Sequence, residues 1–409
     1  MRIGVPQLSD SPDRPGWVRI SARITYDGFV SGDEEVWFET RQEHASELTS
    51  LADPWLAAMA PLAVATGRPI HLDQPFDTVL AENLIRLSHV WSSWYPAMKP
   101  LQINGEAVGP ASPVRSGRTG CFFSAGVDSF YSVIHDRATG SGSIEDFLII
   151  HGADIAIDNW SGYRRFSLDV QEIALALDKQ VVEVATNLRA TRFRMTNYDL
   201  HSVAALLAAC ALTLGRRYRK LLISSTWDTP RLHPNGSHPV TDPLFSTSCT
   251  EFVHHGAWAS RLEKTRVVAS DLVARRHLRV CWESPSGDNC GRCLKCLRTM
   301  VALELDGTLP QIETFPAGGV DLARLRSNHF LFRDGPYYED LLGAAERAGR
   351  TDIAEAITAA FARTKRLDRL LLLGLGRQMH AGLRMRPWAR RLLLPIRQRI
   401  FRMGRWLAP

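Results

Sequence analysis

Four short apolar segments alternate with helical patterns between residues 118 and 225, and this alternation constrains the fold more than any other feature. Apolar strands interleaved with helices predict a parallel sheet that is covered by helices on both faces. We therefore expect an α/β fold in this part of the chain. The predicted strands are 120–124, 146–151, 181–185 and 221–225, and the predicted helices between them are 128–137, 166–178 and 201–215.

The first of these strands runs into a turn of small residues and then into a helix. Ser124-Ala125-Gly126 follows the apolar strand, and Asp128 and Ser129 fall in the first helical turn. Such a turn presents free backbone N–H groups and a helix N-terminus, and both attract phosphate. The hydroxyls of Ser124 and Ser129 can donate to phosphate oxygens, and Asp128 can hold a Mg²⁺ that a nucleotide carries. A turn without a ligand is the alternative.

The pattern Ser-x-Gly-x-Asp-Ser after a strand resembles the pyrophosphate loop (PP-loop) of the N-type ATP pyrophosphatases. It is not a Walker A loop, because no Gly-Lys-Ser/Thr follows. The common Ser-Gly-Gly is Ser124-Ala125-Gly126 here, and alanine restricts the backbone where glycine is freer. The resemblance implies a HUP-like nucleotide-binding domain that uses ATP and Mg²⁺. It also implies which residues bind the nucleotide: Ser124, Ala125, Gly126, Val127, Asp128 and Ser129 at the phosphates, and Ile150 and His151 at the adenine, largely through their backbone.

Polar residues follow the other three predicted strands. In parallel sheets, ligands bind at the carboxyl ends of the strands. We therefore expect one nucleotide pocket to be lined by the loop and by three further segments: His151-Gly152-Ala153-Asp154, Thr186-Asn187-Leu188-Arg189 and Ser225-Thr226-Trp227-Asp228.

Four cysteines near residue 290 have the spacing of metal ligands. Cys281 precedes Cys290-Gly291-Arg292-Cys293-Leu294-Lys295-Cys296. Four thiolates complete a tetrahedral Zn²⁺ site with no open position, so we expect a structural zinc. An iron–sulfur cluster is the alternative, because four cysteines also suit that ligation. The predicted metal ligands are Cys281, Cys290, Cys293 and Cys296.

The PP-loop and the cysteine cluster together resemble the 7-cyano-7-deazaguanine synthase (QueC) family. The resemblance covers about 118–305, and Arg298 follows Cys296 by two positions, as in the family pattern. Residues 1–117 and the chain after 310 have no counterpart in the standard enzyme. The substrate-side segment also differs, since the chain has His151-Gly152-Ala153-Asp154 where the family has a Tyr-Gly-Gln-Arg-His-like stretch.

A basic segment lies before the cluster, in a predicted helix from Ser260 to Arg276. The family has Lys-x-x-Ile/Val-Val at this place, and the chain has Lys264-Thr265-Arg266-Val267-Val268. The resemblance implies that Lys264 faces the phosphates and assists the reaction together with Asp128; a solvated basic helix face is the alternative. Residues 229–258 before it are expected to form a functional loop, whose polar candidates are His238, Asp242, His254 and His255.

Sequence patterns outside this region predict two further parts. Alternating residues in 17–40 predict a β-hairpin, and helical patterns follow at 50–65 and 77–94, with one more strand near 68–72. Gly, Pro and Ser in 109–117 indicate a linker. We therefore predict a small α+β N-terminal domain (1–110), a PP-loop ATP pyrophosphatase domain with the cysteine cluster (118–306), and a helical, basic C-terminal extension (307–409), which includes helices near 337–348 and 352–373.

The basic charge of the chain is concentrated at its C-terminal end. The formal net charge is +6, yet residues 363–409 contain 13 Lys and Arg against the single acid Asp368. From 384 onward, Leu392, Ile396 and Ile400 share one helical face that arginines flank. This pattern suits an anionic membrane surface or an acidic protein partner; a packed or disordered tail is equally open, and nucleic acid is less favoured because no RNA-binding module accompanies it.

The absence of a signal-peptide pattern and of any apolar run of transmembrane length predicts a cytoplasmic protein, with membrane-surface association through the tail as the alternative. An apolar content of 45% and a charged content of 22% are those of a folded globular protein and exclude a disordered chain. A homodimer is also left open.

The resemblance implies an ATP-dependent C–N ligase. A carboxylate or amide oxygen of a small molecule or peptide attacks the α-phosphate, pyrophosphate leaves, and a nitrogen nucleophile then displaces AMP. Charge stabilisation by the loop suffices, without a covalent enzyme nucleophile. Two alternatives stay open: a tRNA-modifying, thiolation-type PP-loop enzyme, and a non-catalytic nucleotide-binding module of a larger assembly.

Overall fold

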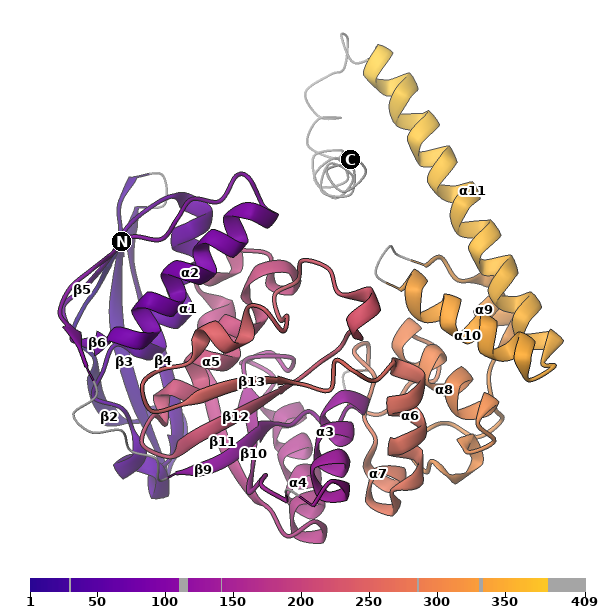
Figure 1. The fold of residues 1–409 in the computed structure, drawn as a ribbon, viewed down its shortest axis with the longest axis horizontal. Helices are drawn as coiled ribbons and strands as arrows, with labels where there is room; N and C mark the ends of the chain where they lie inside the picture. The colour runs from indigo at the N-terminus through magenta and orange to yellow at the C-terminus, as the bar shows by residue number, and fades with distance from the viewer. Residues whose placement is uncertain (29–30, 110–116, 141, 285–286, 331–333, 382–409) are drawn as a thin grey trace. The chain divides into compact units, whose positions relative to one another are not determined.

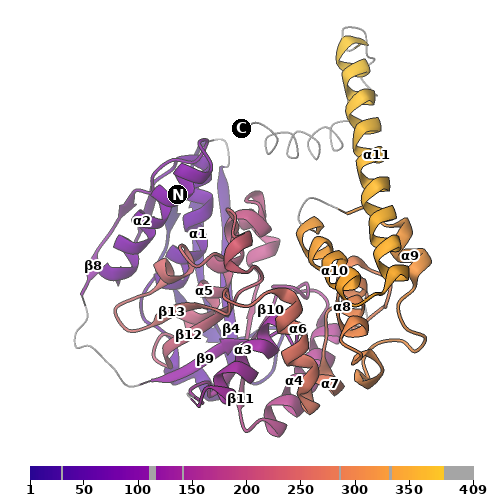
Figure 2. The ribbon, with the colours of Figure 1, turned by 45° about the vertical axis from the view of Figure 1, so that its right-hand side comes forward.

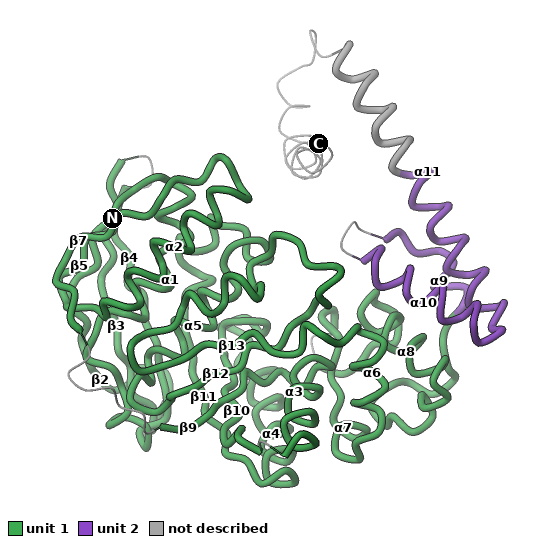
Figure 3. Tube along the Cα trace, viewed as in Figure 1, with its two compact units in different colours: residues 1–321 green, residues 322–409 purple. Residues whose placement is uncertain are grey.

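A computed structural model describes residues 1–28, 31–109, 117–140, 142–284, 287–330 and 334–381 of the chain. The chain forms two compact units, residues 1–321 and residues 322–409 (Figure 3). Most of the predicted linker at 109–117 and the whole predicted amphipathic tail from residue 384 lie outside the described residues.

The first unit is built on one large, mostly parallel sheet, which confirms the α/β class (Figure 1). Five strands form a parallel half in the order β13-β12-β9-β10-β11. Four of them are the strands that the sequence predicts, shifted by at most a few residues. The bounds are β9 (Arg118–Phe122), β10 (Asp146–His151), β11 (Gln180–Thr186), β12 (Tyr218–Ser224) and β13 (Glu251–His255).

The N-terminal residues extend the same sheet. The predicted hairpin is present as β3 (Trp17–Tyr26) and β4 (Gly32–Arg41), and β4 pairs antiparallel with β11, with Val184 opposite Thr40. The Thr40 hydroxyl also donates to the Glu183 carbonyl at 2.8 Å. The remaining strands of this region are β1 (Arg2–Ile3), β2 (Gln7–Asp10), β5 (Ile70–Leu72) and β7 (Ile103–Asn104), with a separate pair of β6 (Phe76–Asp77) and β8 (Ala107–Val108).

The structure therefore divides the chain differently from the sequence pattern. Residues 1–110 and 118–306 were expected as separate domains, but both belong to the compact unit that ends at Asp321. The physical reason is the β4–β11 pairing, which makes one continuous sheet and one continuous core from the two parts.

Helices cover both faces of this sheet. On one face, α3 (Val127–Ala138) and α4 (Trp160–Ala176) share a core with the cysteine cluster. There α3 contacts α6 (Arg261–Ser270), and α4 contacts α7 (Leu272–His277) (Figure 2). On the other face α1 (Asp53–Thr66) packs against α5 (Val203–Thr213), with α2 (Thr78–Trp94) beside α1. Helix α8 (Leu294–Leu305) follows the cysteine cluster.

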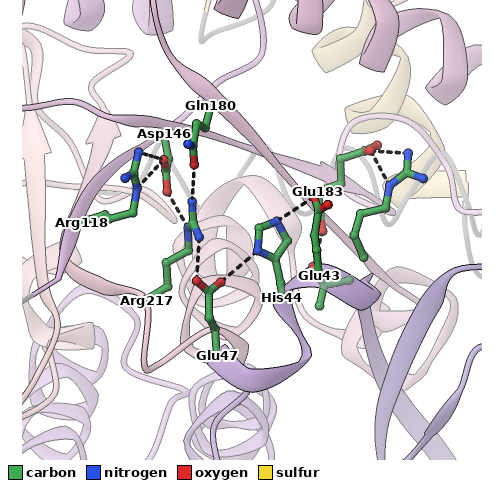
Figure 4. A network of polar contacts seen from close by, with 10 residues as sticks. Glu43, His44, Glu47, Arg118, Asp146, Gln180, Glu183 and Arg217 are labelled. Atoms are coloured by element: carbon green, nitrogen blue, oxygen red, sulfur yellow. Dashed lines mark hydrogen bonds and ion pairs between the residues drawn. The ribbon is translucent and has the colours of Figure 1, made fainter.

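A buried ionic network joins the N-terminal part to the strand ends opposite the predicted ligand edge (Figure 4). The Arg217 guanidinium donates to Asp146 at 2.6 Å and to Glu47 at 2.7 Å, and Asp146 also accepts from Arg118 at 2.8 Å. The Asp146 side chain is fully buried and Arg217 nearly so. Breaking such a pair would leave an uncompensated buried charge, so this network favours one arrangement of the two parts.

Two local predictions on the C-terminal side of β12 are wrong. The expected loop 229–258 contains β13, which pairs in parallel with β12 from Glu251 to His255. The expected helix from Ser260 to Arg276 is two helices, α6 and α7, which break at Asp271. The Asp271 side chain accepts from the amides of Val273 and Ala274, and this capping starts a new helix.

The second unit consists of α9 (Leu322–Ser327), α10 (Gly335–Arg347) and α11 (Thr351–Ala381). α11 packs against α9 and α10 through residues such as Ile353 and Ile357, which are fully buried. The two helices predicted near 337–348 and 352–373 are present, and the second is longer than expected. Among the described helices, none has the length and apolar content needed to cross a membrane.

The continuity of the sheet predicts how fragments behave. A fragment of residues 118–321 would expose the edge of β11 and the apolar residues that face α1, so we expect it to aggregate. A fragment of residues 1–321 keeps β11 paired with β4 and keeps these apolar residues covered by α1, so it should be monodisperse. Circular dichroism and size-exclusion chromatography of the two fragments test this, and a well-folded, monomeric 118–321 fragment would contradict the single-unit description.

Candidate nucleotide and metal site

The turn after β9 combines a left-handed residue with a helix N-terminus, where free backbone amides can bind an anion. Ala125 has φ = 55°, a left-handed conformation that costs a residue with a side chain roughly 1–2 kcal/mol. The Arg279 amide donates to the Ala125 carbonyl at 2.8 Å and holds this conformation. Gly126 then caps α3 with an extended backbone, so the first-turn amides of the helix point out of its N-terminus without intrahelical partners.

The two predicted serine hydroxyls shape the turn. Ser129 Oγ donates to the Gly126 carbonyl at 3.1 Å and accepts from the Ser124 amide at 3.3 Å. Ser124 Oγ accepts from the Gly126 amide at 3.4 Å, a long contact. Ser129 is buried, while Ser124 is exposed. Ser124 is thus the hydroxyl that a ligand reaches first, and Ser129 mainly fixes the loop.

Asp128 lies beside two cations from α6. Its Oδ1 is 2.7 Å from Arg261 Nη1 and 3.6 Å from Lys264 Nζ. α6 begins at a capping box, in which the Ser260 side chain accepts from the Glu263 amide and the Glu263 carboxylate accepts from the Ser260 amide. This cap fixes the first turn of α6, so that Arg261 and Lys264 both face the loop.

Lys264 is a buried cation. Only 1% of its side chain is exposed, its Nζ donates to the Ser225 carbonyl at 2.6 Å, and Nζ lies 5.7 Å from the centre of the Tyr131 ring. Burial lowers the pKa of Lys264, whereas the Asp128 carboxylate raises it. The alternative of a solvated basic helix face is therefore wrong for Lys264.

Two further basic side chains of this region feel the charge of Asp154. Burial lowers the pKa of Lys295, and Asp154 raises it. Burial also lowers the pKa of Arg279, and Asp154 raises it. The cations that lie directly beside the loop carboxylate Asp128 are Arg261 and Lys264, and this pair suits a polyphosphate.

Ile150 and His151 end β10 at the same edge of the sheet as the loop, yet their side chains point away from a common pocket. Ile150 packs in the core that α5 covers. The His151 ring stacks on Tyr163 at 4.3 Å, and its Nδ1 lies 3.2 Å from Arg14 Nη2. Burial, and next Arg14, lower the pKa of His151 to about 4. Any contact of these two residues with adenine would therefore use the backbone, as the resemblance implies.

The polar candidates in 229–258 separate into two places. His254 Nδ1 lies 2.7 Å from the fully buried Asp242 carboxylate, which also accepts from the His238 amide at 2.9 Å. His255 lies on the other face of β13, where its Nδ1 is 3.0 Å from Ser132 Oγ. Burial lowers the pKa of His255 to about 4. Among the described residues, no hydrogen bond or ion pair joins the Asp242–His254 pair to the loop.

The four predicted cysteines form one cluster. Their sulfurs all lie within 4.8 Å of one another, and the Sγ distances are 3.9 Å for both Cys281–Cys293 and Cys290–Cys296. A disulfide needs about 2.05 Å. A tetrahedral zinc with Zn–S bonds of about 2.3 Å places its sulfurs about 3.8 Å apart. The cluster therefore can hold a metal ion such as zinc.

Backbone amides support these sulfurs, as in metal-binding cysteine turns. The amides of Arg292 and Cys293 donate to Cys290 Sγ at 3.4 and 3.3 Å, and the Cys296 amide donates to Cys293 Sγ at 3.4 Å. Gly291 has φ = 67°, and an added Cβ would lie 3.1 Å from Pro316, so this turn requires glycine. The donor set and its amide support fit a structural Zn²⁺.

Comparisons of the chain with family models, with curated proteins and with solved structures find no significant match. The family resemblance therefore depends on the loop and cluster residues themselves.

Sequence reasoning gave no role to two basic residues that the structure places at the loop. Arg261 pairs with Asp128, and the Arg279 amide donates to the Ala125 carbonyl. The sequence carried only a weak signal for them, since Arg261 lies near the start of the predicted basic helix and Arg279 lies shortly before Cys281.

Removing one thiolate tests the metal site. We expect the wild-type protein to contain about one equivalent of zinc, and Cys293→Ser to lose most of it and to melt at a lower temperature. Cys249→Ser is the matched control, because Cys249 lies outside the cluster. Elemental analysis by mass spectrometry measures the content. Metal-free wild-type protein, or equal loss in both variants, would contradict the assignment; iron in place of zinc would favour the iron–sulfur alternative.

Proposed function

We propose that the protein is an ATP-dependent, AMP- and pyrophosphate-forming C–N ligase with a HUP-like PP-loop domain similar to the 7-cyano-7-deazaguanine synthases. It activates a carboxylate or amide oxygen by adenylation and transfers the activated group to a nitrogen nucleophile. The observation that carries this proposal is the strand–turn–helix at Ser124–Ser129, whose left-handed Ala125 and helix N-terminus lie against Asp128, Arg261 and Lys264.

The chain's own residues supply fixed charge at this loop. The first-turn amides of α3 and the Ser124 hydroxyl donate to phosphate oxygens. Lys264 and Arg261 stabilise the negative charge that pyrophosphate carries away. Because Lys264 is buried and held by the Ser225 carbonyl, little reorganisation is needed when that charge develops.

Asp128 is the residue that would hold Mg²⁺. Magnesium commonly binds proteins through one or two carboxylates together with the phosphates of the nucleotide, so a single carboxylate at the loop fits. The ion would supply charge neutralisation between the phosphates. In the structure Asp128 pairs with Arg261 instead, so Mg²⁺-nucleotide binding would exchange an internal ion pair for contacts to the ligand.

The thiolation alternative requires a reactive cysteine near the loop. Cys121 is fully buried beneath it, and burial raises the pKa of its thiol to about 12. Cys210 is fully buried in α5, and burial raises its pKa as well. Thiolates are the reactive form, so these two residues are inert. These observations favour the ligase over a thiolation enzyme.

Substitution of Asp128 tests the nucleotide site. We expect wild-type protein with Mg²⁺ to bind ATP, and Asp128→Asn to bind it about tenfold more weakly, a change of about 1.4 kcal/mol. Glu172→Gln, an exposed carboxylate on α4, is the matched control and should bind as wild type does. Isothermal titration calorimetry measures the affinities. If the wild-type protein does not bind ATP, the proposed function is wrong.

Product analysis separates the ligase from a nucleotide-sensing module. Fractionated metabolite extract serves as the source of the unidentified acceptor, and AMP and pyrophosphate are quantified by chromatography. We expect both products in equal amounts from the wild type, and about 10²-fold slower formation by Lys264→Met. ATP that is bound and stays intact with every fraction would instead favour a sensor.

A further inference from the structure

We propose that Arg14, in the turn between β2 and β3, is a positioning residue of the nucleotide site. Through the His151 imidazole it holds the segment after β10, residues 151–156, against which the nucleoside half of ATP lies. This inference rests on the proposed function, because it assigns a further residue to the same site. It gives the N-terminal part of the chain a role in nucleotide binding beyond extending the sheet.

The strands beside the loop decide where the nucleoside half of a bound nucleotide lies. β9, which ends at the loop, is flanked in the sheet by β12 and β10. On the β12 side, Lys264 Nζ donates to the Ser225 carbonyl at 2.6 Å and lies 3.6 Å from Asp128 Oδ1, so this side is occupied. Ligands of parallel sheets bind at the carboxyl ends of the strands. A nucleotide with its phosphates at residues 124–129 therefore extends over the end of β10.

The segment after β10 is a tight turn that one imidazole closes. Gly152 has φ = 101°, and an added Cβ would lie 2.1 Å from the Thr186 carbonyl oxygen, so the turn requires glycine. The Gly152 amide donates to the Ile155 carbonyl at 3.0 Å. The His151 ring closes the turn, because its Nε2 lies 3.0 Å from the Ala156 carbonyl oxygen. The conformation of this segment therefore depends on the protonation of the ring.

Arg14 sets which nitrogen of that ring carries the proton. Its Nη2 lies 3.2 Å from His151 Nδ1. A guanidinium can only donate, so Nδ1 accepts, and the proton of the neutral imidazole stays on Nε2, which donates it to the Ala156 carbonyl. The ring is fully buried and stacks on Tyr163 at 4.3 Å, so it has little freedom to turn. Without Arg14 the proton can move to Nδ1, and the Ala156 carbonyl then loses its donor.

The N-terminal hairpin fixes the Arg14 guanidinium in one orientation. Its Nη1 pairs with the fully buried Glu39 carboxylate. The guanidinium carbon lies 5.3–5.7 Å from the centres of three indole rings, which favour a cation at this place. These rings belong to Trp17, Trp37 and Trp160. The side chain is 10% exposed, so the amino group that reaches His151 is held rather than solvated.

A competing explanation is that Arg14 only stabilises the fold by anchoring the hairpin. Arg41 distinguishes the two explanations, because it anchors the same hairpin with the same kinds of contact. Its Nη2 lies 2.6 Å from the buried Glu183 carboxylate, and its guanidinium carbon lies 4.9 Å from the centre of the Trp17 ring. Glu183 lies within β11, so Arg41 holds a strand and not the segment after β10. A purely stabilising arginine should lower the melting temperature and leave nucleotide affinity unchanged.

The test compares two ligands of the full-length protein with Mg²⁺ by isothermal titration calorimetry: α,β-methylene-ATP, and inorganic triphosphate, which lacks the nucleoside. We expect Arg14→Met to bind the ATP analogue about tenfold more weakly than wild type and to bind triphosphate equally well. Glu39 keeps Arg19 at 2.7 Å, so Arg14→Met leaves no unpaired buried charge and should fold. Arg41→Met is the matched control and should bind both ligands as wild type does.

Substitution of His151 tests whether Arg14 acts through this ring. His151→Phe keeps an aromatic ring beside Tyr163 but cannot donate to Ala156, and it leaves both arginines in place. We expect it to show the same selective loss of about tenfold. The double variant Arg14→Met/His151→Phe should lose no more than either single variant, because two residues that act as one unit are not additive.

Each outcome decides between the explanations. If wild type does not bind the analogue, the proposed function itself fails. If wild type binds it and either Arg14→Met or His151→Phe binds it equally well, the nucleotide site stands and the inference is overturned. The inference is also overturned if Arg14→Met weakens triphosphate binding to the same degree, if Arg41→Met shows the same selective loss, or if the double variant loses about a hundredfold.

Discussion

The hydrogen bond from the Arg279 amide to the Ala125 carbonyl is the contact on which the candidate site depends. It holds an alanine in a left-handed conformation that the residue would otherwise avoid, and the N-terminus of α3 follows directly at the carboxyl end of β9. Arg279 stands two residues before Cys281. The geometry of the loop and that of the cysteine cluster are therefore coupled through a few peptide units.

Through this coupling, a metal ion in the cysteine cluster would support the function that we propose. A closed four-cysteine site has no open position for substrate, so its contribution is to hold chain segments together. Here those segments are the one that contains Arg279, whose amide holds Ala125, and the first turn of α8. The buried Asn289 clamps this arrangement, since its side chain accepts from the amides of Val280 and Cys281 and donates to the Leu278 carbonyl.

The N-terminal part of the chain supports the site from neighbouring strands of the same sheet. Its hairpin adds to the parallel half through β4, and its Arg14 contacts His151 at the end of β10. Arg14 is itself held by the fully buried Glu39 carboxylate. The strand end that the resemblance assigns to adenine is thus fixed by residues that precede it by more than a hundred positions in the sequence.

Local sequence patterns predicted part of the fold and of the candidate site. The apolar run before Ser124 and the helical spacing after Ser129 are properties of neighbouring residues. The spacing of Cys290, Cys293 and Cys296 is likewise local, and it indicates metal ligands directly. The pairing of β4 with β11 could not be predicted, because it joins residues 140 or more positions apart whose register only the folded chain defines. β13 was missed because its Glu251, His254 and His255 resemble loop residues, and the break before α7 depends on one capping side chain, Asp271.

The most direct test of the account is hydrogen–deuterium exchange of the full-length, zinc-loaded protein with and without α,β-methylene-ATP and Mg²⁺. We expect slower exchange of the amides in Ser124–Phe130, and little change at the buried Asp146–Arg217 network at the opposite ends of the strands. Exchange that is unchanged at Ser124–Phe130, or protection confined to another part of the chain, would contradict the assignment of this loop as the phosphate site.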